Sequence, residues 1–159
     1  MILIASFIAL LFPRTNAVAH RYNGTPSPDK STAINNTAIL NSALLSLQSG
    51  DTLIIPNRTY WLTGGVFASN LDNVTISLDG ILKFVPVPGR SGWPTQPCPH
   101  DSKKKCVKKA ILFTNLDQLT LTSSNLQGGI VDGGGEPWWG YANYLLHRED
   151  RPKLFDCSG

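Results

Sequence analysis

The apolar residues of this chain follow two different spacings, and the first of them is helical. Within residues 33–47 they recur every three or four positions, which is the period of a helix with one buried face. Ser31 or Thr32 is placed to cap the first turn, and Gly50 to follow the last turn as the C′ residue. We therefore predict a helix that ends at Gln48.

Beyond this segment the pattern changes to many short runs rich in β-branched, leucine and aromatic residues. Glycine, asparagine, aspartate or proline separates one run from the next, which is typical of strands joined by tight turns. The runs predict an all-β domain behind the helix. The expected strands cover residues 52–55, 59–62, 66–67, 74–78, 81–84, 110–113, 119–122 and 129–131.

An internal repeat predicts how these strands are arranged. Residues 69–76 align without a gap on residues 114–121, and four of the eight positions are identical. The 45-residue offset contains a proline-rich and then basic insertion, residues 86–108, and without these 23 residues 22 remain. That is about one coil of a β-helix, whose inward face is buried only when coils stack on one another. We predict a right-handed parallel β-helix with the helix capping its N-terminal end.

The end of the chain begins the same unit once more. Residues 153–158 resemble residues 111–116, and the sequence then stops. We therefore expect residues 31–159 to be the N-terminal coils of a longer β-helix, truncated at the C-terminus. The last coil of such a piece should leave an exposed edge that pairs with further coils or aggregates.

The first residues predict a secreted, extracellular protein. An apolar run over residues 2–12 precedes residues 17–19 (Ala-Val-Ala), which fit the small-residue cleavage pattern of a signal peptide. We expect removal of residues 1–19, His20 as the new first residue, and a flexible leader over residues 20–30. A short membrane anchor is the alternative, although the run is too short to span a bilayer.

Glycosylation and cysteine signals agree with secretion. Cys98 and Cys106 are close together in the insertion, and we expect them to pair in an oxidising compartment. Cys157 is then left over, either with a partner further along a longer chain or as a buried free thiol. Four N-glycosylation sequons have their acceptors at Asn23, Asn35, Asn57 and Asn73.

One segment resembles a known family. Residues 128–139, Gly-Gly-Ile-Val-Asp-Gly-Gly-Gly-Glu-Pro-Trp-Trp, are similar to the glycine-rich, double-tryptophan signature of glycoside hydrolase family 28, the polygalacturonase-type enzymes. Residues 73–76 (Asn-Val-Thr-Ile) and 151–154 (Arg-Pro-Lys-Leu) resemble strands of the same family on either side of it. The resemblance covers residues 31–159. It implies a pectin-lyase-like β-helix and inverting hydrolysis of galacturonan in plant or algal cell walls.

The motifs that carry this chemistry in the family are not found here. Inversion needs an acid and a base carboxylate on opposite faces of the sugar, roughly 6.5–9.5 Å apart. The chain has no Asn-Thr-Asp, no adjacent aspartates and no Gly-His-Gly, and its one Arg-x-Lys, residues 151–153, contains proline and is differently placed. We therefore predict no catalytic residue in this chain, and we assign the hydrolase activity to a longer parent protein.

Three residues of the family-like segment are candidates for binding substrate: Asp132, Trp138 and Trp139. A turn role for Asp132 and packing roles for the tryptophans explain them as well, and we favour these. Lysines 103–105 could attract an acidic polysaccharide, although a solvated loop is the simpler explanation.

Charge and spacing limit the other partners. The formal net charge of +3 is too small to indicate nucleic acid, and the histidines and cysteines lack the spacing of metal ligands. We expect no cofactor, no metal, no membrane contact after removal of the signal peptide, and a monomer when the protein is complete. The expected partner is a galacturonan-type polysaccharide. The alternatives are a non-catalytic carbohydrate-binding or adhesive β-helix module and a polysaccharide lyase on the same fold.

Overall fold

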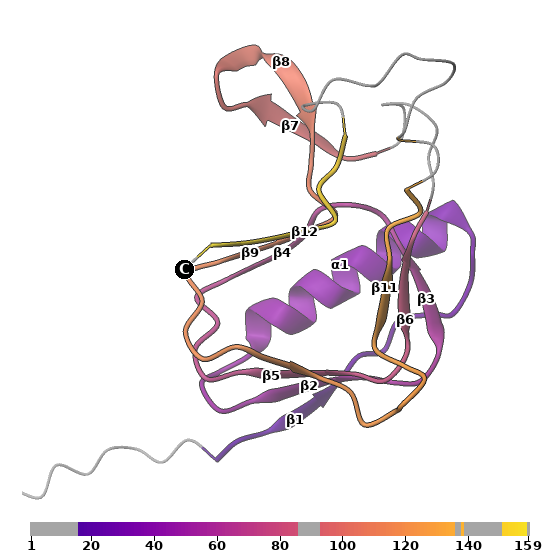
Figure 1. Ribbon diagram of the computed structural model, residues 1–159, viewed down its shortest axis with the longest axis vertical. Coiled ribbons are helices and arrows are strands. Elements are labelled where there is room, and N and C mark those ends of the chain that lie inside the picture. Colours follow the sequence, from indigo (N-terminus) through magenta and orange to yellow (C-terminus); the bar gives the residue numbers. More distant parts are fainter. Residues whose placement is uncertain (1–15, 86–92, 136–137, 139–150, 159) are drawn as a thin grey trace, which may run out of the picture.

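The body of the protein consists of three parallel sheets whose strands alternate along the chain. The computed structural model describes residues 16–85, 93–135, 138 and 151–158. Seen down the axis of the coils, the sheets form three sides of a triangle (Figure 1). The first sheet contains β1 (Ala19–Arg21), β2 (Thr52–Ile55), β5 (Thr75–Leu78) and β10 (Thr120–Thr122). The second sheet contains β3 (Thr59–Leu62), β6 (Ile81–Phe84) and β11 (Ile130–Asp132). The third sheet contains β4 (Val66–Ser69), β9 (Ile111–Thr114) and β12 (Phe155–Ser158).

The strand register confirms the repeat found in the sequence. In the first sheet Thr52 pairs with Thr75, and Thr75 pairs in turn with Thr120, so that the second step is the 45-residue offset of the alignment. The first step is 23 residues long, which is one coil without an insertion. Leucine, isoleucine, valine and phenylalanine point inward at alternate positions and form one continuous core. The predicted parallel β-helix is therefore confirmed.

The last strand lies where it was predicted but in a different register. The alignment placed Phe155 opposite Phe113, whereas β12 pairs Phe155 with Ile111, two residues away. A shift of two residues keeps the same side chains on the same face, so the hydrophobic pattern alone does not distinguish the two registers. In the observed register Lys109, which precedes β9, forms an ion pair with Asp156 on β12.

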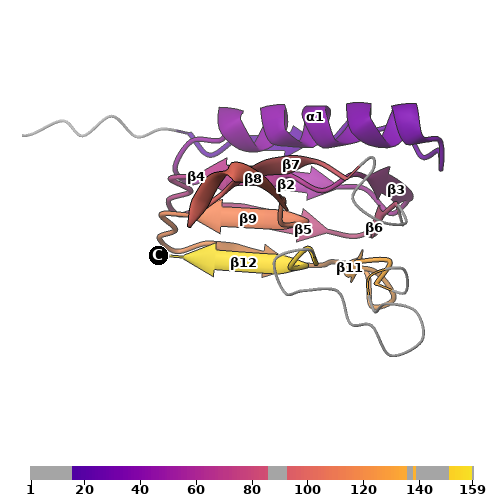
Figure 2. The same ribbon diagram turned by 90° about the horizontal axis from the view of Figure 1, so that it is seen from above.

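The helix α1 (Lys30–Ser46) covers the N-terminal end of the coils, as predicted (Figure 2). It packs on β3 and β4 and buries Leu40 and Leu44 in the core. Its ends differ from the prediction: the N-cap is Asp29, and the C-cap is Leu47. Gly50 has a φ of 91° and lies in the turn before β2, so it does not end the helix.

The segment before the helix is ordered, which corrects the flexible leader expected for residues 20–30. β1 adds a strand to the edge of the first sheet by pairing with β2. Tyr22 is fully buried, with its ring edge-on to Tyr60 at 4.8 Å between centroids. The side chain of Asn36 holds the next residues, because it accepts a bond from Thr25 N at 2.8 Å and donates one to Thr25 O at 2.8 Å.

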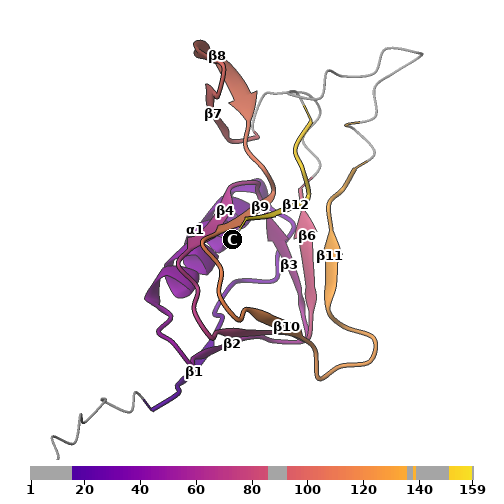
Figure 3. The same ribbon diagram turned by 60° about the vertical axis from the view of Figure 1, so that its left-hand side comes forward.

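The insertion forms a small arm outside the coils. β7 (Thr95–Cys98) and β8 (Asp101–Val107) make an antiparallel hairpin that projects from the corner between β6 and β9 (Figures 1 and 3). Cys98 and Cys106, the two cysteines expected to pair, form a disulfide within it.

At the end of the coils opposite α1, no further strand of the described residues covers the last coil (Figure 2). β10, β11 and β12 are each the last strand of their sheet. Three of their apolar side chains, Leu121, Ile130 and Phe155, are exposed. The exposed edge predicted for the last coil is therefore present in the structure.

Candidate functional site

A large hollow lies between the third coil and the base of the hairpin arm. Its volume is about 440 Å³, which falls in the range of sites for small molecules and single sugar units. Most of its surface is apolar, and a few charged groups lie at its margin. It is lined by Trp93, Ala110, residues 132–135, Trp138 and residues 151–154.

Two tryptophans, Trp93 and Trp138, form the apolar wall of this pocket. Their rings meet edge to face with 5.2 Å between centroids, and both residues are almost fully buried. Trp93 fits closely over Gly64, where any Cβ would collide with the indole, and it donates its Nε1–H to Lys108 O at 2.8 Å. Gly64 is thus required for close approach of the ring. Trp93 was not a candidate from the sequence, since a lone Trp-Pro in an insertion gives no signal of its burial.

Trp138 is 5% exposed, so it packs rather than presenting a free face for a sugar ring. The packing role favoured for it from the sequence is confirmed. Its Nε1 is buried and has no hydrogen-bond partner among the described residues. A ligand oxygen that reached this atom would therefore remove a desolvation penalty. Trp139, the other tryptophan of the candidate pair, lies outside the described residues.

Asp132 is the one carboxylate among the described residues that line the pocket. Its Oδ1 accepts a bond from Gly134 N at 3.0 Å, and its Oδ2 lies 3.3 Å from Lys83 Nζ. The Gly134 N–H, and then Lys83, lower the pKa of Asp132 below its ordinary value, so this carboxylate stays ionised at neutral pH. The bond from Gly134 N agrees with the turn role favoured from the sequence, and a general acid, which needs a raised pKa, is not found among the described residues that line the pocket.

The cationic margin comes from the string Arg151-Pro152-Lys153, which sequence analysis set aside. Pro152 is compatible with this position because the segment runs into β12 and is not itself a strand. Lys153 also lies 3.6 Å from Asp156, while half of its side chain remains exposed. Two positive charges beside an apolar wall suit an anionic ligand with a hydrophobic face.

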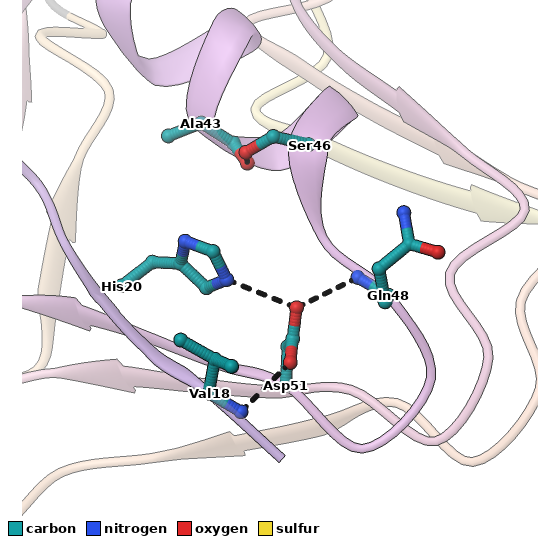
Figure 4. Close-up of polar contacts among 6 residues, drawn as sticks. All are labelled: Val18, His20, Ala43, Ser46, Gln48 and Asp51. Carbon is teal, nitrogen blue, oxygen red and sulfur yellow. Dashed lines mark hydrogen bonds and ion pairs between the residues drawn. The ribbon is translucent and has the colours of Figure 1, made fainter. Parts of the chain in front are cut away.

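A second cluster of chemically active groups lies at the other end of the molecule, around His20 and Asp51. His20 Nε2 is 2.9 Å from Asp51 Oδ2, a distance that an acid–base pair would have. No nucleophile completes it among the described residues, because the nearby Ser46 hydroxyl donates to Ala43 O at 2.8 Å (Figure 4). The pair is therefore structural.

The remaining sequence candidates lie on the surface. Lys103, Lys104 and Lys105 are exposed on β8, away from the pocket lining. Cys157 is exposed, which corrects the alternative of a buried thiol. The sequon residues Asn23, Asn35, Asn57 and Asn73 are all exposed.

Within the described ranges, no group of three or more His, Cys, Asp or Glu residues is placed to hold a metal ion. The helix in the same ranges is not long and apolar enough to cross a membrane.

Fold and pocket together define a parallel β-helix protein with an apolar, cation-rimmed pocket on its third coil. Comparison with known proteins adds no family to this description: no family model, curated protein or solved structure matches the chain.

Proposed function

We propose that this chain forms the N-terminal coils of a secreted, polygalacturonase-like glycoside hydrolase, and that its own contribution is to bind an acidic glycan of the galacturonan type. The observation that carries the proposal is the position of the family-like segment. Asp132 to Gly135 and Trp138 line the one pocket that also contains Arg151 and Lys153. A sequence similarity and a pocket therefore coincide in the same residues.

The chemistry of the pocket favours a uronic acid over a neutral sugar. A sugar ring has apolar C–H faces that suit the wall around Trp93 and Ala110. Each galacturonate unit adds a carboxylate, for which an arginine is the best-matched partner because of its planar pair of donors. The ionised Asp132 is already held by Gly134 and Lys83, and no ion pair of Arg151 is found among the described residues, so Arg151 is the group that we expect to bind the carboxylate of the ligand.

The same residues supply no pair of carboxylates for inverting hydrolysis. Asp132 alone lines the described part of the pocket, and its lowered pKa opposes proton donation. We therefore assign cleavage to coils of the parent protein beyond this chain.

The proposed secretion is supported by the disulfide between Cys98 and Cys106 and by the exposure of the four sequon asparagines.

Affinity electrophoresis through gels that contain polygalacturonate tests the proposal. We expect the chain to be retarded by polygalacturonate and not by fully methyl-esterified pectin. Because a charge-assisted bond is lost, Arg151→Ala should weaken binding about tenfold. Lys104→Ala, an exposed lysine on the hairpin arm, is the matched control and should change retardation little. A reducing-sugar assay with the same chain should show no new ends.

Three results would contradict this account. Equal retardation in both gels would show that carboxylates are not recognised. A larger loss with Lys104→Ala than with Arg151→Ala would move the binding to the arm, and release of reducing ends would place catalysis in this chain. A non-catalytic β-helix module would be retarded in the same way as the N-terminal part of a hydrolase. Transcript sequence past Gly159 distinguishes these two hypotheses, because Asp pairs and a Gly-His-Gly at coil spacing are expected only for the hydrolase.

A further inference from the structure

A buried carboxylate joins the N-terminal strand to the first coil. Asp51 lies in the turn between α1 and β2 and is only 3% exposed. Its Oδ1 accepts a bond from Val18 N at 2.9 Å, and its Oδ2 accepts one from Gln48 N at 2.9 Å and faces His20 Nε2 (Figure 4). The N–H of Gln48, and then that of Val18, lower the pKa of Asp51 below its ordinary value. The group is therefore an anion that is contacted from two segments, by Val18 and His20 of the N-terminal stretch and by Gln48 beyond the end of α1.

Val18 is the first residue whose backbone is held on both sides. Its N–H donates to Asp51, and its carbonyl oxygen accepts a bond from Thr52 N at 3.0 Å. Asn16 and Ala17 are exposed, and no backbone hydrogen bond of either is found among the described residues. Among the described residues, Val18 is thus the first that is bonded to the coils through both its N–H and its carbonyl oxygen, and it lies two residues before the mature N-terminus that the sequence predicts.

The two candidate cleavage positions have different consequences for this cluster. Removal of residues 1–19 would take Val18 away and leave both Asp51 Oδ1 and Thr52 N without their partners. Removal of residues 1–17 keeps both bonds. Thr15 and Ala17 are also small residues, and one residue separates them. Cleavage after Ala17 therefore fits the same small-residue pattern as cleavage after Ala19.

We propose that the mature chain begins at Val18 and that its α-ammonium group forms an ion pair with Asp51. A peptidase of the signal-peptidase class would supply the step, in which water hydrolyses the bond between Ala17 C and Val18 N. Ala17 leaves with the leader as a carboxylate, and Val18 N takes up protons to become the ammonium. An amide donor at 2.9 Å is thereby replaced by a charged one, which pairs the buried carboxylate.

The ion pair has a definite pH signature. The titratable groups that face the ammonium are Asp51 on the α1–β2 turn and, across the same carboxylate, His20; Gln48 and β2 add none. Asp51 should raise the pKa of the α-amino group above its ordinary range of about 7.7–8.0. Because that pKa is raised in the folded state, the stabilisation is complete below this range and disappears as the pH rises through the raised pKa.

N-terminal sequencing and intact mass of the full chain, secreted from a eukaryotic host and deglycosylated, test the cleavage position. The proposal rests on the proposed secretion but not on glycan binding, so failure of the polygalacturonate experiment does not affect it. We expect Val18 as the first residue. A chain that begins at His20, or one that retains Met1, would overturn the proposal.

A second measurement tests the ion pair itself. Reductive ¹³C-dimethylation of the secreted protein keeps the α-amine titratable and makes its pKa visible by NMR. We expect a pKa above the ordinary range in the wild type and within it in Asp51→Asn, while Asp72→Asn, which changes an exposed carboxylate, should leave it raised. If Asp51→Asn does not fold, the wild-type value decides alone: an ordinary pKa would disprove the ion pair.

Discussion

At the scale of single residues, Asn36 is the polar side chain that ties the N-terminal segment to the coils. It is fully buried on α1, bonds both backbone groups of Thr25, and donates a third bond to Trp61 O at 3.0 Å. Its backbone carbonyl also accepts a bond from the Tyr22 hydroxyl at 3.0 Å. The side-chain amide of Asn36 therefore connects α1 to the segment before it and to β3.

Replacement of this amide should be costly. Asn36→Ala removes three buried side-chain hydrogen bonds, two to Thr25 and one to Trp61 O, and we expect the free energy of unfolding to fall by about 2–3 kcal/mol. The exposed Ser31 on the same helix gives the control, since Ser31→Ala should change it by less than about 0.5 kcal/mol. Urea titration followed by circular dichroism measures both. A small effect of Asn36→Ala would show that the segment before α1 is not bonded as described.

The residue scale is also where the sequence predicted least. Asn36 appeared only as the middle residue of a sequon, because an asparagine carries no sign of whether it is buried. Arg151 and Lys153 were set aside for their proline, and Trp93 was not considered. Asn36 and Trp93 contact residues distant in the chain, and Arg151 and Lys153 line a pocket with such residues, which spacing along the sequence does not report.

At the scale of elements, the strands that were predicted best are those with turn residues on either side. β2, β3 and β6 have the predicted bounds, because alternating apolar residues between Gly, Pro and Asp turns define both ends. β1 was missed because its pairing depends on Asp51 and β2, not on its own polar sequence. The hairpin of the insertion was read as a loop, since its strands are polar and the disulfide fixes their pairing.

The open coil edge makes the last strands the least protected elements. Leu121 on β10 is 56% exposed and lines the apolar channel at the core of the coils. We expect Leu121→Lys to lower self-association of the chain in sedimentation velocity, because a charge on an edge strand opposes strand addition. Leu45→Lys is the matched control, as Leu45 is 83% exposed but lies on the outer face of α1. Equal effects of the two variants would contradict an edge-specific contact.

At the scale of the whole molecule, the account depends on coils that stack in register. The pocket exists because β11 and β12 carry residues 132–135 and 151–154 to the same corner, beside the base of the hairpin arm. The 45-residue repeat predicted this stacking for β4, β5, β9 and β10, where the sequence repeats itself. It gave the wrong register for β12, where the copy is weak; Lys109 and Asp156 form an ion pair in the observed register.

Disulfide cross-linking between neighbouring coils tests the stacking most directly. In a Cys157→Ser background, Thr75→Cys with Thr120→Cys joins paired residues of β5 and β10, whose Cα atoms should be about 4.8 Å apart. That separation suits a disulfide, whereas Thr75→Cys with Thr122→Cys places the Cα atoms about 8 Å apart, beyond its reach. We predict rapid oxidation of the first pair and not of the second. Faster oxidation of the second pair, or no oxidation of either pair, would contradict the register on which the fold and the pocket depend.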